Sequence, residues 1–139
     1  MMKKLAFVNH KGGVGKTSLC THIAGAISER GARVLLVDGD SQGDLSALFL
    51  SAPAESLAHT VADLFTESGV LARDIVQPTP YPNISILPAD RRLNAVDMTH
   101  GYQHSPAAQT LADAVSELAD EFDYVLFDCP PRPHLTGFA

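Results

Sequence analysis

The sequence predicts an α/β fold with a mostly parallel sheet and flanking helices. Two short apolar runs, residues 4–9 (KLAFVN) and 33–38 (RVLLVD), enclose a segment in which apolar residues recur at helical spacing. This order of strand, helix and strand is that of a βαβ unit. The second run is continuously apolar, which is typical of a parallel strand covered on both faces. Two more apolar runs alternate with helical segments farther along, and such alternation indicates the α/β class.

The first half of the chain is expected to contain three helices. The first spans residues 15–30, and Gly31 suits its C-terminal stop. Short helices are expected at residues 60–65, with the leading threonine as the cap, and at residues 71–76. Residues 77–83 contain three prolines and are expected to be a connection without an element.

The second half is expected to contain two strands and two helices. The first strand spans residues 84–87 (ISIL), and a helix is expected at residues 92–98. Ser105 followed by proline is a strong helix start, so the next helix should span residues 106–121. Residues 122–128 (FDYVLFD) are expected to form the last strand.

Length and composition limit the possible classes. The 139 residues are 45% hydrophobic, enough for one domain with a core and too apolar for intrinsic disorder. No apolar run approaches the roughly 18 residues of a membrane span, and the N-terminal run is too short for a signal peptide. We therefore expect a cytoplasmic protein. With 10 Lys and Arg against 16 Asp and Glu, non-specific DNA binding by this segment alone is disfavoured.

A glycine-rich loop, GGVGKT at residues 12–17, lies between the first expected strand and helix. Phosphate-binding loops require a glycine, four residues and then Gly-Lys-Ser/Thr, and His10 stands where the first glycine is expected. The rest of the loop is chemically complete, because glycines let backbone N–H groups turn toward phosphate oxygens at a helix N-terminus. Lys16 is expected to neutralise the β- and γ-phosphates, and the Thr17 hydroxyl to bind Mg²⁺.

A second lysine, Lys11, precedes the glycines, and the segment KGGVGKTS resembles the deviant Walker A motif of the ParA/MinD family of ATPases. The resemblance implies a P-loop NTPase fold with ATP and Mg²⁺ as ligands. It also implies a homodimer on ATP binding, in which Lys11 reaches the phosphates held by the partner. The residues implied in nucleotide binding are Lys11, Gly12, Gly13, Val14, Gly15, Lys16, Thr17 and Ser18.

Acidic residues follow the second expected strand in the segment DGDSQGDLS, residues 38–46. Carboxylates at the C-terminal end of a strand lie where α/β sheets bind ligands, although Asp and Gly also favour turns there. The segment is similar to the family's DxDPQGNxT switch segment, with Ser41 in place of the proline, Asp44 in place of the asparagine and Ser46 in place of the threonine. By this resemblance Asp40 orients the attacking water and helps to hold hydrated Mg²⁺, and Asp38 supports the Mg²⁺ site from behind.

Asp128 ends the last expected strand and fits the Walker B position, where a carboxylate holds Mg²⁺ through water. The segment DYVLFDCPP is similar to the family's DYxxxDxPP. The catalytic residues implied are Lys11, Lys16 and Asp40. The residues expected at the metal are Thr17, Asp38, Asp40 and Asp128.

Other candidate metal ligands are disfavoured. Cys20 and Cys129 supply too few thiolates for a disulfide framework or an Fe–S cluster, and Cys129 is expected to fill space beside the site. His100 and His104 are four residues apart, but they have no third ligand nearby, and a solvated loop is expected.

The resemblance covers almost the whole chain and implies an ATP-hydrolysing ParA-type protein of plasmid or chromosome partition. A ParB-like centromere-binding protein would stimulate hydrolysis, and the longer parent would bind non-specific DNA on the nucleoid. Two alternatives stay open, a MinD-like membrane-associated positioning ATPase and a non-catalytic nucleotide-binding or interaction module. A GTPase is disfavoured, because the sequence contains no Asn-Lys-x-Asp motif.

Family members continue past the last strand, so residues 1–139 are expected to be the N-terminal part of a ParA-type P-loop ATPase domain. The segments that follow this strand in family members include those used for DNA or membrane binding. By family analogy the strand order is 84–87, 34–38, 124–128 and 5–9. The last of these would be an exposed apolar edge that favours pairing with another chain.

Overall fold

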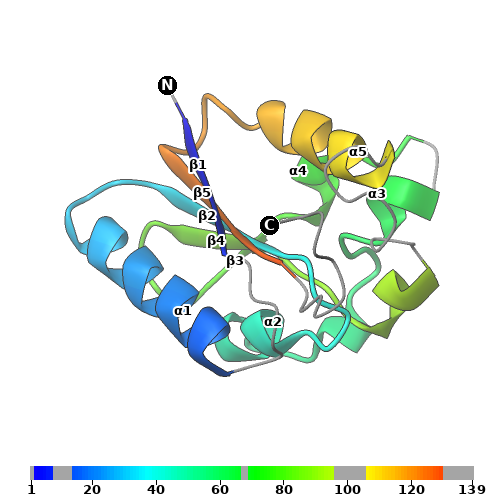
Figure 1. The fold of residues 1–139 in the computed structure, drawn as a ribbon, viewed down its shortest axis with the longest axis horizontal. Coiled ribbons are helices and arrows are strands. Elements are labelled where there is room, and N and C mark those ends of the chain that lie inside the picture. Colours follow the sequence, from blue (N-terminus) through cyan, green and yellow to red (C-terminus); the bar gives the residue numbers. More distant parts are fainter. Residues whose placement is uncertain (1, 8–13, 67–68, 96–105, 130–139) are drawn as a thin grey trace, which may run out of the picture.

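The computed structural model describes residues 2–7, 14–66, 69–95 and 106–129. A five-stranded sheet forms the middle of three layers (Figure 1). The strands are β1 (Lys3–Phe7), β2 (Val34–Asp38), β3 (Gln77–Pro78), β4 (Ile84–Leu87) and β5 (Tyr124–Asp128). The helices are α1 (Val14–Glu29), α2 (Asp44–Phe49), α3 (Asp63–Thr66), α4 (Ala72–Ile75) and α5 (Pro106–Ser116), with 3₁₀ turns η1 (Ala54–Ser56) and η2 (Arg91–Ala95).

The order of the strands is β1-β5-β2-β4-β3, and all pairs except β3–β4 are parallel. This confirms the α/β fold class and the order expected for the four longer strands. The expectation that residues 77–83 hold no element was wrong, because Gln77 and Pro78 pair with β4. A proline has no N–H to give to a ladder, and it is tolerated here because β3 lies at the edge of the sheet.

Alternate residues of β2 point into two separate cores, so the strand is buried at all five positions. Val34 and Leu36 pack with α1 and α2, whereas Leu35 and Val37 pack with α4 and α5. The continuously apolar sequence of this strand is therefore explained, because both faces of the sheet are covered by helices (Figure 1).

Strand β1 is exposed at four of its five residues, and Leu5 retains 41% of its accessible surface. The local prediction of a buried strand was wrong here, and the exposed edge expected from the family analogy is observed. Within the described residues, β1 has β5 as its only neighbouring strand. An apolar run by itself does not reveal whether its strand lies in the centre or at the edge of a sheet.

Helix α1 ends as expected, since Gly31 has a φ of 87° and donates its N–H to the Ser28 carbonyl at 2.9 Å. Helix α5 ends at Ser116 and not at residue 121, because the following residues form successive turns with bonds to the third residue back. Buried Leu118 anchors these turns in the core. The cap expected at Ser105 lies outside the described residues.

The short elements of the middle are the least well predicted. The helix expected from Thr60 begins at Asp63, whose carboxylate accepts the Thr60 N–H at 2.9 Å. Helix α4 was expected, whereas α2 and η1 were not. The turn η2 occupies the start of the helix expected at residues 92–98, and the rest lies outside the described residues. Among the described residues, no helix is long and apolar enough to cross a membrane.

Candidate functional site

The carboxyl ends of β2 and β5 lie side by side next to the start of α1. Asp38 and Asp128 are direct partners in the parallel register of these strands, and Phe7 of β1 is the partner of Asp128 on its other side. The Asp128 carbonyl accepts the Gly39 N–H at 2.9 Å, which continues the ladder past the end of β2. Two strand-end carboxylates therefore meet at the position where α/β sheets bind ligands.

Thr17 connects the first helix to this acidic edge. Its hydroxyl donates to Asp128 Oδ2 at 2.9 Å, and Asp128 is only 1% exposed. Thr17 lies in the first turns of α1, which carries no acidic side chain in its first turn. The partial positive charge at this helix end is thus left available to an anion.

Asp38 is fully buried, and both of its carboxylate oxygens accept hydrogen bonds. Oδ1 accepts the Asp40 N–H at 3.0 Å, and Oδ2 accepts the Ser46 N–H at 3.0 Å and the Ser46 hydroxyl at 2.6 Å. Burial raises the pKa of Asp38 to about 7, because desolvation outweighs these hydrogen bonds and the negative charge of Asp128 adds to the rise. Both carboxylate oxygens of Asp38 are therefore occupied by protein donors. The side chain supports the site from a buried position.

Asp40 is half-buried at the start of a tight turn. Its Oδ1 accepts the Gln42 N–H at 3.0 Å, and its carbonyl accepts the Gly43 N–H at 2.9 Å. Gly43 has a φ of 68°, and a Cβ there would lie 2.8 Å from the Ala89 carbonyl oxygen. Only glycine fits this point, where the acidic segment passes directly against the loop that follows β4.

Ser46 and Arg92 are functional candidates to which the sequence analysis assigned no role. Ser46 Oγ also accepts the Ala89 N–H at 2.9 Å, so it joins β2, α2 and the loop after β4. Arg92 donates to both oxygens of Asp90, with its shortest contact at 2.7 Å. The available signals were a hydroxyl residue at the threonine position of the switch segment and the pair Asp90-Arg92 directly after a strand.

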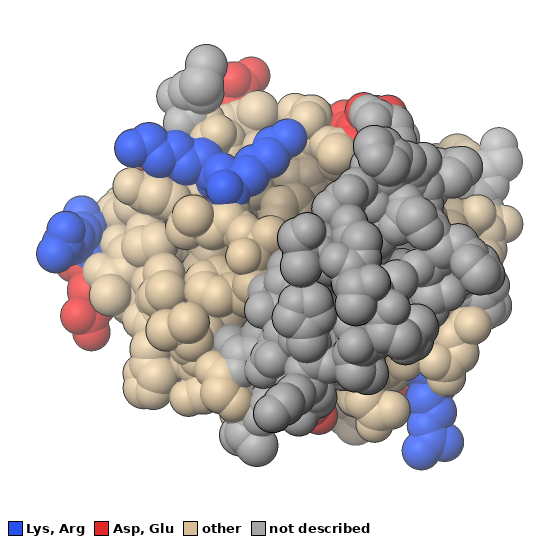
Figure 2. All heavy atoms as spheres, in the orientation of Figure 1, with Lys and Arg blue, Asp and Glu red and all other residues tan. Residues whose placement is uncertain are grey.

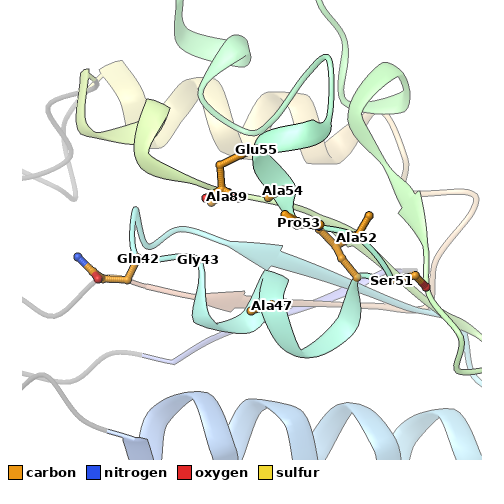
Figure 3. A pocket seen from close by; sticks show the side chains of 10 residues that line it. Gln42, Gly43, Ala47, Ser51, Ala52, Pro53, Ala54, Glu55 and Ala89 are labelled. Atoms are coloured by element: carbon orange, nitrogen blue, oxygen red, sulfur yellow. The ribbon is translucent and has the colours of Figure 1, made fainter.

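Two hollows flank the acidic segment, residues 38–46. One of about 620 Å³ lies between α1 and α2, beside Thr17, and is lined by Thr17, Ser18, Thr21, Asp44, Ala47 and Leu48. The other, about 350 Å³, lies between the turn at Gly43, the chain after α2 and Ala89 (Figure 3). The labelled side chain of Gln42 points away from the other lining residues. The first hollow adjoins the site described above, and the second lies behind it.

The site offers oxygen atoms, which are the donors that Mg²⁺ prefers. The Thr17 hydroxyl and the Asp128 carboxylate are already in contact, and Asp40 is close along the chain. No group of three His, Cys, Asp or Glu residues in the described part of the chain could hold a metal by itself. This donor set fits Mg²⁺, which usually takes one or two protein ligands and completes its shell with water and substrate phosphate.

The structure brings the predicted Thr17, Asp38, Asp40 and Asp128 to one edge of the sheet. Val14, Gly15, Lys16 and Ser18 lie at the start of α1, where Gly15 and Ser18 are exposed. Lys11, Gly12 and Gly13 lie outside the described residues, as do His100 and His104. Cys129 is buried directly after Asp128, and its N–H donates to the Phe7 carbonyl at 3.1 Å.

Comparison with known proteins identifies related sequences over nearly the whole chain. Residues 2–137 match the AAA_31 family model, described as an AAA domain. An uncharacterized protein of Mycobacterium tuberculosis is 38% identical over 129 residues, which are 93% of this chain and 40% of that protein. The chromosome partitioning protein ParA of Caulobacter vibrioides is 33% identical over 132 residues, 94% of this chain and 48% of ParA. The chain thus spans less than half the length of these relatives.

Solved structures show the same arrangement. Cobyrinic acid a,c-diamide synthase from Mycobacterium smegmatis, with bound ATP analogue and magnesium, is 33% identical with a TM-score of 0.80, over 94% of this chain and 52% of that one. The septum site-determining protein MinD from Pyrococcus horikoshii, complexed with Mg-ADP, is 26% identical with a TM-score of 0.74, over 94% and 50%. Both neighbours are nucleotide and magnesium complexes.

Proposed function

This chain belongs to the AAA_31 family of AAA domains, and on that premise we propose that it is an ATP-binding and ATP-hydrolysing switch of the ParA type in plasmid or chromosome partition. The observation that carries the proposal is the hydrogen bond from the Thr17 hydroxyl to Asp128. This contact joins a residue of the phosphate-loop helix to a carboxylate at a strand end, and in P-loop NTPases residues of these two types hold Mg²⁺. The relative named as a chromosome partitioning protein supports the cellular role.

The proposed chemistry is positioning and charge neutralisation. Lys16, with the residues from Lys11 to Ser18, would bind the phosphates of ATP at the positive end of α1. Thr17 and Asp128 would hold Mg²⁺, which when bound neutralises charge on the phosphate oxygens. Asp40 would orient the attacking water, and buried Asp38 would fix the backbone of Asp40.

The proposed partners follow from the same family relation. ATP binding would close a homodimer in which Lys11 of each protomer reaches the nucleotide of the other, and a ParB-like centromere-binding protein would stimulate hydrolysis in the cytoplasm. Slow hydrolysis would make the molecule a timed switch. On the face drawn in Figure 2, the Lys and Arg side chains of the described residues lie in separate small groups. The chain has 10 Lys and Arg against 16 Asp and Glu, and we assign DNA contact to the part of the longer relatives that the match does not cover.

Calorimetric titration with ATP·Mg²⁺, with light scattering on the same samples, tests the proposal on the full 139-residue chain. Lys16→Ala should abolish binding, because the phosphate charge loses its neutralising partner. Lys4→Ala is the matched control, since Lys4 lies exposed on β1 and contacts Ser116. The expected result is binding with dimer formation in the wild type and in Lys4→Ala. Equal binding by Lys16→Ala, or no binding by the wild type, would overturn the assignment.

A further inference from the structure

We infer that Ser46 is a positioning residue for the acidic segment, because it fixes the Asp38 carboxylate and, through Asp38, the backbone of Asp40. The inference rests on the proposed function, in which Asp40 orients the attacking water. Ser46 lies in the first turn of α2 and is 1% exposed, so bulk water does not compete for its hydroxyl. It acts entirely through Asp38 and makes no contact with the reacting atoms.

The direction of the Ser46 hydroxyl proton is determined by its two neighbours. A serine hydroxyl has one proton to donate and lone pairs that accept. The Ala89 N–H donates to Oγ at 2.9 Å, and Oγ donates to Asp38 Oδ2 at 2.6 Å. The Ser46 N–H adds a second bond to the same oxygen at 3.0 Å. One residue thus supplies both donors that hold this side of the buried carboxylate.

The other oxygen of Asp38 carries the effect to Asp40. Oδ1 accepts the Asp40 N–H at 3.0 Å, and a carboxylate is planar and rigid. If the bond from the Ser46 hydroxyl is lost, Oδ2 is held by the Ser46 N–H alone, so the carboxylate is held less firmly and Oδ1 fixes the Asp40 backbone less well. A displacement of about 1 Å in a positioning group can reduce catalysis roughly 100-fold. The expected effect is therefore on the rate of hydrolysis and not on the binding of nucleotide.

The Ala89 end of this chain of bonds is itself fixed. The carboxylate of the next residue, Asp90, accepts the Arg92 Nε–H, which is shared between its two oxygens, and a second bond from Nη2 at 2.7 Å. The same guanidinium donates to the backbone carbonyls of Ala54, Leu57 and Ala58. Ser46 therefore ties Asp40 to the loop after β4 and to the chain around η1, and not only to the turn in which Asp40 lies.

The test compares Ser46→Ala and Ser46→Thr with Ser56→Ala in the full chain. Ser46→Ala should lower kcat at least about tenfold and leave both KM and the ADP affinity without Mg²⁺ within about threefold of the wild type. Ser46→Thr keeps the hydroxyl and should restore kcat to within about threefold. Ser56→Ala is the control, since its hydroxyl donates only to the Pro53 carbonyl at an exposed position, and it should behave as the wild type.

A second measurement follows the wild type without turnover. Adding Mg²⁺ to the ADP complex should shift the backbone amide NMR resonance of Ala89 together with that of Asp40, because Ser46 connects them. In Ser46→Ala the Asp40 resonance should still shift while the Ala89 resonance no longer does. The wild-type half of this measurement needs no folded variant, and neither half needs measurable turnover.

The outcomes separate the two proposals. Absence of nucleotide binding by the wild type overturns the proposed function. Nucleotide binding with unchanged kcat in Ser46→Ala, or with no recovery in Ser46→Thr, overturns only the role of Ser46. An Ala89 resonance that does not respond to Mg²⁺ in the wild type also overturns only the role of Ser46.

Discussion

The fold shifts the pKa values of two aspartates, Asp38 and Asp90, in opposite directions. Burial raises the pKa of Asp38 to about 7, far above its ordinary value of 3.8. Burial also acts to raise the pKa of Asp90, but the hydrogen bonds and charge of Arg92 outweigh it and leave that pKa below the ordinary value. Asp38 is held by uncharged donors only, whereas Asp90 has a guanidinium, and this difference decides the sign.

The raised pKa of Asp38 predicts that the stability of the protein depends on pH. A group with a raised pKa contributes stability that is fully present below its unfolded value and is lost as the pH rises through its folded value. The free energy of unfolding should thus fall between pH 4 and pH 7, and the difference between 3.8 and about 7 corresponds to roughly 4 kcal/mol at most. Asp90 acts in the opposite sense, and its contribution is lost as the pH falls below about 4.

Urea unfolding at a series of pH values measures this effect. Asp38→Asn should flatten the decline between pH 4 and pH 7, because the replacement does not titrate. Asp120→Asn removes an exposed carboxylate and should keep the decline of the wild type. A decline that persists unchanged in Asp38→Asn would assign the pH dependence to another group.

At the scale of elements, the turn before α2 is constrained by its backbone conformation and by its contact with the loop after β4. Gly43 is the N-cap of this helix in a left-handed conformation, and it makes no side-chain cap. The capping role passes to Asp38, which accepts the N–H of Ser46 in the first turn and lies eight residues before Ser46. Because the cap comes from the end of β2, α2 forms only when the sheet is in place.

Alanine substitutions at three glycines are predicted to change the stability by different amounts. Gly43→Ala should cost the most stability, more than about 2 kcal/mol, because the new Cβ combines left-handed strain with a 2.8 Å approach to the Ala89 carbonyl. Gly31→Ala has a similar φ but open space around its Cβ, and should cost about 1 kcal/mol. Gly25→Ala lies within α1 with open space, and should stabilise by about 0.5–1 kcal/mol.

Chemical denaturation of the three variants checks the order. The close approach of Gly43 to Ala89 is the feature under test, since Gly31 supplies the strain without the contact. A cost for Gly43→Ala no greater than that for Gly31→Ala would show that the loop after β4 moves aside easily. Such mobility would also weaken the argument that Ala89 fixes Ser46.

At the scale of the whole molecule, the sheet is covered on both faces, but β1 is exposed on one side. Helices α1 and α2 cover one face of the sheet, and α3, α4 and α5 cover the other (Figure 1). Along β1 the backbone has no second strand partner among the described residues, and Leu5 is exposed. Lys3 and Lys4 on the same strand weaken edge-to-edge pairing, as charges on edge strands do, so association is expected only at high concentration.

Association through this edge is the expected result at high concentration without nucleotide. Leu5→Lys should reduce it, because a third charge on β1 makes pairing with a second copy less favourable. Leu71→Lys is the matched control, since Leu71 is 43% exposed against 41% for Leu5 and lies before α4, away from β1. Light scattering over a concentration series measures the effect. A wild type that stays monomeric, or an equal effect of the two substitutions, would contradict the prediction.

The sequence by itself determined the α/β class, the longer elements and the family. These properties depend on local signals, namely apolar periodicity, a glycine directly after the first helical segment, and three motifs in a fixed order. The order of the four longer strands also followed from the family relation. Thr17 was selected from the phosphate-loop pattern and Asp128 from its place at the end of an apolar strand, whereas the roles of Asp38 and Asp40 came from the resemblance to the family's switch segment.

Only the tertiary structure decided what these residues contact. The bond from Thr17 to Asp128 joins residues 111 positions apart, and that from Ala89 to Ser46 spans 43. Helix α2 and strand β3 were missed because a partner outside the element stabilises each of them. Local propensity records the preference of a residue for its own backbone conformation, whereas burial, pKa and hydrogen-bond partners depend on which strands lie side by side.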